Sequence, residues 1–248
     1  MNNIDEFAFE IKKKKELSGA DLDFVKVLVI EALQKKKIKF GDLNNKDKKI
    51  LMKEIRQNLR NFVGRFRKSV VLSGSKEDIL KNHLSTAERI NFYPELKKIV
   101  FSLNISSILD LGCGLNPIAL AKRGIKYYAS DINSSDLSLV SSFFIDNKIE
   151  GKTFVYDLRK IDNSLPYADL VLIFKVLDII EKKGHKLAEK IIKSVKCKFL
   201  LVSFPTTKIS GKRMEFPKRA WFEKMLSRLE YKFQVFKSDN EIFYLVTR

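Results

Sequence analysis

The chain has 248 residues, which is enough for one large α/β domain and a smaller accessory domain. Its 48 Lys and Arg against 30 Asp and Glu give a formal net charge of +18, so we expect a polyanionic partner, although a lysine-rich composition also occurs without one. The polar N-terminus, the absence of a membrane-spanning apolar run and the spacing of the two cysteines argue against a secreted, membrane-bound or zinc-binding protein, and we expect a reduced, cytoplasmic one.

Residues 1–75 are expected to form a helical, basic domain that binds RNA or the ribosome. Apolar residues recur at helical spacing in three stretches, 4–11, 22–33 and a third that begins at Ile50. Phenylalanines lie between the arginines of the third stretch, as suits contacts with an RNA backbone and its bases. Each basic cluster alone is more often a solvated helix face, and it is the presence of several around one small module that favours binding. The candidate RNA-binding residues here are Lys12, Lys13, Lys35, Lys36, Arg56, Arg60, Arg65 and Arg67.

A Ser/Gly turn at 70–75 marks the expected domain boundary, so that residues 76–248 form the second domain with connecting helices at its start. Because of this separation, we expect residues 1–75 to contribute no affinity for a cofactor. Beyond the turn, Ser85 and Glu88 have the spacing of a capping box at a helix start.

Strand and helix patterns alternate in the second domain and predict a parallel sheet covered on both faces. A short polar turn joins the last two strands, which are therefore expected to form an antiparallel hairpin. This α/β arrangement, a Rossmann-like doubly wound sheet that ends in a hairpin, is the plan of class I SAM-dependent methyltransferases. The expected strands are 108–111, 126–130, 153–156, 170–174, 199–204, 232–236 and 242–246, and the expected helices lie near 118–122, 135–144, 185–194 and 219–229.

A Gly-x-Gly turn after the first of these strands is the centre of the expected site. Asp110, Gly112 and Gly114 are candidate cofactor-binding residues, because glycines without a Cβ let a ligand lie against the backbone. The helix that follows opens with Asn116, a good N-cap, and Pro117, which removes one N–H from any anion cradle. This disfavours a pyrophosphate and suits S-adenosylmethionine, which carries no phosphate.

Three further candidates follow neighbouring strands at the carboxyl edge of the sheet, where ligands bind in doubly wound folds. Asp131 ends the second strand, where a carboxylate can accept both ribose hydroxyls, or it caps the next helix. Asp157 follows the third strand and could accept from the adenine amino group or cap a turn. Lys175 follows the fourth strand, where the transferred methyl group would lie; it could bond the O6 and N7 edge of guanine or extend away from the sheet end.

Methyl transfer from a sulfonium is an in-line displacement, which mainly requires positioning with water excluded. The residues after the fourth strand, 174–178, lack the Asn/Asp-Pro-Pro-aromatic loop used for exocyclic amines. Cytosine-carbon methylation needs a nucleophilic cysteine, and neither Cys113 nor Cys197 lies in a Pro-Cys loop. A ring nitrogen such as guanine N7 needs no base, so the sequence favours ring-nitrogen methylation.

From about His83 to Tyr244 the chain resembles the 16S ribosomal RNA guanine-N7 methyltransferases of aminoglycoside resistance, the Arm/Rmt type. Five motifs in order carry the resemblance: 83–89, 107–120, Asp131, 174–177 and 203–223. The resemblance implies S-adenosylmethionine as cofactor and, as substrate, a decoding-centre guanine of 16S rRNA in the 30S subunit (position 1405 in bacterial numbering). It also implies a basic ribosome-binding domain at the N-terminus and a role in aminoglycoside resistance.

The resemblance further implies roles for single residues. Arg89 would bind the carboxylate of S-adenosylmethionine above Gly112, while Asp131 takes the ribose and Asp157 lies by the adenine. Lys175 would act in or beside the target-base pocket. Lys212 and Arg213, in the loop of the last motif, are further RNA-binding candidates.

The chain departs from the family pattern on the side of the target base. Asp178 stands where proline is usual, Lys218 where tyrosine is usual, and the loop after Lys212 is shorter. Alternatives to the expected activity are methylation of another rRNA nucleotide, methylation of a small molecule, and RNA binding on an inactive methyltransferase scaffold. We expect a monomer without a membrane or a bound metal.

Overall fold

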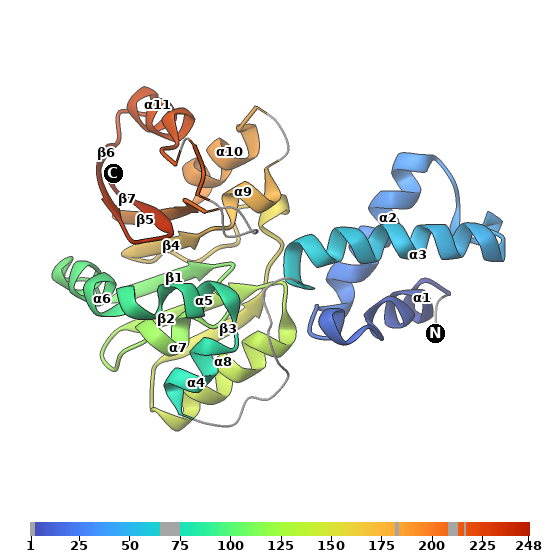
Figure 1. Cartoon of the computed structure of the whole chain (residues 1–248), viewed down its shortest axis with the longest axis horizontal. Helices are drawn as coiled ribbons and strands as arrows, with labels where there is room; N and C mark the ends of the chain where they lie inside the picture. Colours follow the sequence, from blue (N-terminus) through green and yellow to red (C-terminus); the bar gives the residue numbers. More distant parts are fainter. Residues whose placement is uncertain (1–2, 65–74, 182–183, 208–212, 216) are drawn as a thin grey trace.

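The computed structural model describes residues 3–64, 75–181, 184–207, 213–215 and 217–248. Residues 3–64 form a group of helices, here called the helical module, which lies to one side of the sheet (Figure 1). It consists of α1 (Asn3–Lys12), the short η1 (Lys15–Leu17), α2 (Leu22–Lys36), η2 (Phe40–Asp42), α3 (Asn45–Leu59) and the π-helical turn η3 (Arg60–Gly64).

The helical module has its own apolar core, as its sequence pattern predicts. Val25 and Val29 of α2 are fully buried in it, and so are Ile55 and Leu59 of α3. The expectation that Ile50 begins the third apolar face is wrong, because Ile50 is 54% exposed. Leu51 is buried instead, since it lies one helical turn before Ile55 on the same face of α3.

The described residues from 75 onward are built on a seven-stranded sheet of order β3-β2-β1-β4-β5-β7-β6. All seven expected strands are present, with parallel pairing through β5 and an antiparallel β6–β7 hairpin whose β7 also pairs with β5. Because β1 lies between β2 and β4, the chain changes direction across the sheet there, which opens a crevice at the carboxyl ends of these strands. The strands are β1 (Ser107–Leu111), β2 (Lys126–Asp131), β3 (Gly151–Val155), β4 (Leu170–Phe174), β5 (Phe199–Pro205), β6 (Lys232–Lys237) and β7 (Glu241–Thr247).

Helices cover both faces of the sheet, as predicted (Figure 1). Alternate residues of β1 enter different cores: Leu109 packs with α10 and α11, and Ile108 packs with α6, α7 and α8. The helices are α4 (Lys76–Lys81), α5 (Leu84–Arg89), α6 (Tyr93–Ser102), α7 (Asn116–Leu120), α8 (Ser134–Asp146), α9 (Leu177–Ile180), α10 (Lys186–Ser194) and α11 (Ala220–Arg228), with single turns η4 (Ile90–Phe92) and η5 (Leu158–Lys160).

The capping box expected at Ser85 and Glu88 is wrong. α5 begins after His83, Ser85 Oγ lies 3.3 Å from His83 Nδ1, and the Glu88 carboxylate binds a lysine on another element. A capping box does occur at Ser75 and Asp78, where α4 begins. The rest of the predicted 70–75 boundary turn lies outside the described residues.

Both cysteines are free thiols. Burial raises the pKa of Cys113 well above its usual range and that of Cys197 to about 11, so neither thiol is prepared to act as a nucleophile at neutral pH. Among the described residues, no helix combines the length and the apolar character that crossing a membrane requires.

Candidate cofactor site

The carboxyl ends of β1, β2 and β4 open into a pocket of about 820 Å³, its open mouth included. Five of the predicted cofactor or catalytic residues line it: Gly112, Gly114, Asp131, Asp157 and Lys175. Arg89 and Asp110 are not part of its wall. Residues without a predicted role complete the wall, among them His83, Tyr156 and Arg159, together with Phe24, Phe62 and Val63 of the helical module.

The glycine turn needs both glycines. Gly112 and Gly114 have φ angles of +68° and +49°, in the left-handed region that favours glycine. A Cβ on Gly112 would lie 2.5 Å from Val176 Cγ2, and one on Gly114 would lie 2.9 Å from His83 Cε1. The side chains of Val176 and His83 therefore pack directly against the turn and exclude a Cβ at either glycine, while both glycines also line the pocket, where a ligand can lie against the backbone.

Replacing Gly112 by alanine is expected to lower the free energy of unfolding more than replacing Gly124. Gly124 also has a positive φ, +80°, but a Cβ there would meet nothing within 4 Å. The two variants share the backbone strain and differ in the crowding of Val176, so Gly112→Ala should cost about 1–2 kcal/mol more in urea unfolding. Equal losses in the two variants would contradict the steric role of the turn.

Asp131 is positioned by backbone bonds. Its Oδ2 accepts from the Gly114 N–H at 2.8 Å and its Oδ1 from the Asn133 N–H at 2.9 Å. Burial, and then the nearby Asp136 carboxylate, raise the pKa of Asp131. The alternative that Asp131 caps the next helix is not observed, because Asn133 caps α8. Its role with ribose hydroxyls stays a prediction.

Asp157 both lines the pocket and caps η5, so both uses that its sequence position suggests remain compatible with the structure. Its Oδ1 accepts from the Arg159 backbone N–H at 3.0 Å. The Arg159 guanidinium also donates to it, with Nε 2.9 Å from Oδ1 and Nη2 2.6 Å from Oδ2.

Asp110 lies beneath the glycine turn and is 1% exposed. Its Oδ2 accepts from Asn116 Nδ2 at 2.7 Å and from the Tyr127 hydroxyl at 2.8 Å. Burial raises the pKa of Asp110 to about 6. The expectation that Asn116 caps α7 is wrong: its side chain makes no capping bond and instead ties Asp110 to the helix start. A direct contact of Asp110 with the cofactor is therefore not supported by this geometry, and the residue supports the turn from below.

Arg89 is also buried, at 1% exposed. Its Nε and Nη2 donate to the two carboxylate oxygens of Glu241 at 3.1 and 2.8 Å. Glu241, which begins β7, had no predicted role, yet it also accepts from the Ser203 hydroxyl. Binding of the cofactor carboxylate by Arg89 stays a prediction, and it requires donors that Glu241 does not occupy.

Lys175 follows β4 with φ +58°, and its N–H donates to the Ser203 carbonyl at 3.0 Å. A left-handed φ at a residue with a side chain stores strain that is typical of functional sites. Its Nζ lies 2.7 Å from Glu88 Oε2 and 3.4 Å from Glu241 Oε2. With Arg89, these residues form a chain of alternating charges, here called the charge ladder: Glu88, Lys175, Glu241 and Arg89. Two carboxylates and two cations leave it without formal net charge.

Asp178, which replaces the usual proline, has a structural partner. Its Oδ2 accepts from Arg219 Nη2 at 2.8 Å, and the same nitrogen donates to the Pro205 carbonyl. Asp178 thereby joins α9 to the start of α11.

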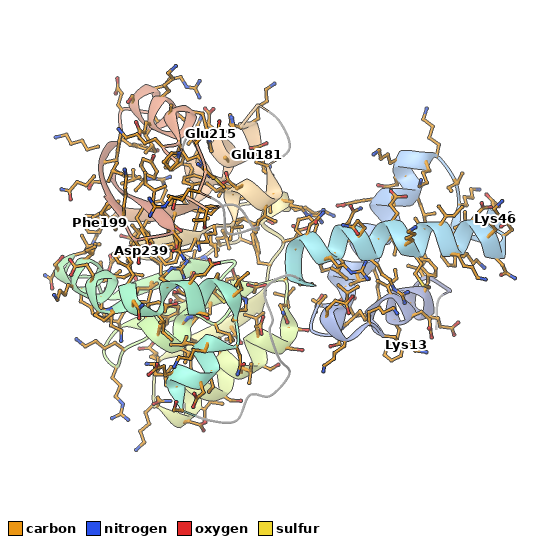
Figure 2. All side chains as sticks on the ribbon, in the orientation of Figure 1. Lys13, Lys46, Glu181, Phe199, Glu215 and Asp239 are labelled. Carbon is orange, nitrogen blue, oxygen red and sulfur yellow. The ribbon has the colours of Figure 1, made fainter. Side chains whose placement is uncertain are left out.

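The predicted RNA-binding side chains lie mainly on the helical module; Figure 2 labels one of them, Lys13, and the exposed Lys46 at its outer surface. Arg56 Nη2 donates to the Glu10 carbonyl at 2.7 Å, and Arg60 pairs with Glu16 at 3.0 Å. These two guanidinium groups hold the helices together, and their contact with RNA stays a prediction. Lys12, Lys35, Lys36 and Arg213 are exposed or half-buried, whereas Arg65, Arg67 and Lys212 lie outside the described residues.

The chain is similar to known ribosomal RNA methyltransferases. A family profile described as "Ribosomal RNA methyltransferase (FmrO)" matches residues 62–245, well over half of the chain. A relative from Serratia marcescens named "16S rRNA (guanine(1405)-N(7))-methyltransferase" is 31% identical over 183 residues, which cover 71% of each chain. A relative of the same name from Frankia casuarinae is 28% identical over 179 residues. That match covers 68% of this chain and 62% of the relative, so it spans less than two thirds of the relative's length.

Among solved structures, the 16S rRNA methylase RmtB aligns with a TM-score of 0.79 over 99% of this chain and 98% of that one. Its sequence is 24% identical, so this likeness shows the shared fold alone. Because the alignment covers nearly all of both chains, it includes the helical module as well as the sheet.

Proposed function

The chain belongs to the FmrO family of ribosomal RNA methyltransferases, and we propose that it transfers a methyl group from S-adenosylmethionine to N7 of guanine 1405 in 16S rRNA. The observation that carries the proposal is the pocket at the ends of β1, β2 and β4, which gathers a glycine cradle and two carboxylates. The names of the Serratia and Frankia relatives support the choice of nucleotide.

The pocket suits this donor in shape and in charge. Asp131 would accept the ribose hydroxyls and Asp157 the adenine amino group, while the glycine turn lies along the ligand. When bound, S-adenosylmethionine supplies a methyl group on a positively charged sulfonium. The charge ladder puts a carboxylate on either side of Lys175 Nζ, so the lysine does not present an uncompensated positive charge to that sulfonium.

The target base would need positioning rather than deprotonation. Guanine N7 carries a free lone pair, so its attack on the methyl carbon requires no general base. The C–S bond breaks as the N–C bond forms, so the sulfonium becomes a neutral thioether and its positive charge passes to the methylated base. The two thiols with raised pKa values support the exclusion of cytosine-carbon chemistry. Lys175 Nζ, fixed at the pocket by Glu88, could donate to guanine O6 while N7 faces the methyl group.

We extend the proposal to the 30S subunit as substrate and to a monomer as the acting form. Residues 1–75 would bind the subunit through their basic side chains, and the remaining residues would carry the chemistry. A fixed positive charge on guanine 1405 would repel a cationic aminoglycoside bound there, so resistance to such antibiotics is part of the proposal.

The product can be identified by incubating 30S subunits with S-adenosylmethionine and the protein, and then treating the extracted rRNA with borohydride and aniline, which cleave at N7-methylguanine. We expect one cut at guanine 1405 that depends on the protein. A parallel reaction on deproteinised 16S rRNA should give much less cleavage if the assembled subunit is the substrate. Methyl label on another base, without a cut at guanine 1405, would contradict the proposed target.

A further inference from the structure

The helical module forms one wall of the candidate cofactor pocket. Phe24, Phe62 and Val63 line the same pocket as Asp131 and Asp157. The expectation that residues 1–75 contribute nothing to cofactor binding does not agree with this geometry. The contacts between the module and the pocket occur at two places, one beside each carboxylate.

At the first place, Arg159 joins the module to Asp157. Its Nη1 donates to Glu31 Oε2 of α2 at 3.0 Å, while Nε and Nη2 donate to Asp157. The guanidinium carbon lies 5.0 Å from the ring centre of Phe24 and 5.4 Å from that of Phe62. Its side chain is 18% exposed. The carboxylates of Glu31 and Asp157 therefore bind the charged N–H groups of this guanidinium, and the rings of Phe24 and Phe62 contact it as cation–π partners.

At the second place, the module contacts the turn that holds Asp131. The Asp21 N–H donates to the Ile132 carbonyl at 2.8 Å, and the Ser135 N–H donates to the Gly19 carbonyl at 3.3 Å. A Cβ on Gly19 would lie 2.6 Å from Asn133 Oδ1, so the Asn133 side chain packs directly against the Gly19 backbone. The helical module thus contacts the turn after β2. In this turn the Asn133 N–H donates to Asp131 and holds its carboxylate in place.

We propose that Arg159 is a positioning residue of the cofactor site, which orients Asp157 toward the adenine amino group and is itself held by Glu31, Phe24 and Phe62 of the helical module. The inference rests on the proposed cofactor. Three N–H groups of Arg159 donate to Asp157: the backbone N–H and Nε to Oδ1, and Nη2 to Oδ2, with Nε also 3.2 Å from Oδ2. A carboxylate has about four lone-pair sites, so one is left for an adenine N–H. Without the fork of the guanidinium, the carboxylate would be free to rotate out of the pocket.

The test compares two ligands that differ at the adenine amino group. Calorimetry measures the affinity of each variant for S-adenosylhomocysteine and for S-inosylhomocysteine, in which a carbonyl oxygen replaces that amino group. The wild type should prefer the adenosyl ligand. Arg159→Gln should bind it on the order of tenfold more weakly and lose most of the preference, because Asp157 is no longer fixed as an acceptor. Arg159→Lys should have an affinity for S-adenosylhomocysteine and a preference for it between those of the wild type and Arg159→Gln. Glu31→Gln should lower both in the same direction but by less than Arg159→Gln does.

Arg228→Gln is the matched control, because Arg228 pairs with Glu189 at the surface and does not line the pocket. It should bind both ligands as the wild type does, and thermal unfolding of every variant shows whether it is folded. The inference is overturned if folded Arg159→Gln keeps the preference, if it loses both ligands equally, or if the wild type has no preference.

These titrations contain no RNA, so they separate the inference from the rRNA target. If the wild type prefers S-adenosylhomocysteine and Arg159→Gln loses that preference, but no N7-methylguanine is made, the inference is supported and the proposed target is contradicted. A wild type that binds neither ligand overturns the inference together with the proposed cofactor.

Discussion

Glu241→Ala is expected to lower the free energy of unfolding by about 3–5 kcal/mol, because it leaves the guanidinium of Arg89 buried without its counter-charge. Arg89 and Glu241 are 1% and 0% exposed, so water cannot replace the lost partner. Although burial opposes its ionisation, Arg89 and then Lys175 hold the pKa of Glu241 below its usual value. The stabilising charge is therefore present at neutral pH and is lost only as pH falls through that lowered pKa. Urea unfolding at pH 7 measures the effect.

Glu189→Ala is the control for this prediction. Glu189 also pairs with an arginine, Arg228, but the Arg228 side chain is 65% exposed. Loss of such a surface pair should cost about 0–1 kcal/mol. Similar losses in Glu241→Ala and Glu189→Ala would show that the buried pair contributes no more than a surface one, and the charge ladder would then not hold the start of β7.

The sheet could be predicted from the sequence because its signals are local. Short apolar runs mark the buried strands, and the polar turn before Glu241 marks the hairpin. The same holds for the pocket residues at strand ends: Asp131 ends β2, Asp157 lies two residues after β3, and Lys175 directly follows β4. Their position at strand ends is enough to bring them to one edge of the sheet.

The charge ladder and the Arg159 contacts could not be predicted, because their partners are far apart in the chain. Arg89 and Glu241 are separated by 152 positions, and Glu31 and Arg159 by 128. No periodicity or spacing rule joins residues at such separations. Both pairs depend on how the finished sheet meets the helices, and only the folded structure shows it.

Local signals were also overridden at helix starts. Asn116 has the residue type of an N-cap, but its amide instead binds Asp110 in the interior. Glu88 has the spacing of a capping box, but its carboxylate binds Lys175. In both cases a partner from another element replaces a backbone N–H, since a buried polar or charged group without its partner would cost more than a missing cap.

Asp131→Ala is expected to weaken binding of S-adenosylhomocysteine by about ten- to a hundredfold, or roughly 1.5–3 kcal/mol, because a carboxylate that accepts both ribose hydroxyls makes two charge-assisted bonds. The backbone N–H groups of Gly114 and Asn133 hold Asp131 in place, so the carboxylate need not be ordered on binding. Calorimetry with the wild type and the variant measures the loss.

The exposed Asp146, at the end of α8, provides the control. Asp146→Ala removes the same charge from the protein without touching the pocket wall, so its affinity for S-adenosylhomocysteine should equal that of the wild type. The affinity of Asp131→Asn for S-adenosylhomocysteine should lie between those of Asp131→Ala and Asp146→Ala. The amide keeps one acceptor oxygen, but its NH₂ group faces the N–H of Gly114 or Asn133. If folded Asp131→Ala bound the ligand as tightly as Asp146→Ala, the ribose would have to lie elsewhere in the pocket, and Asp131 would serve only to fix the turn between β2 and α8.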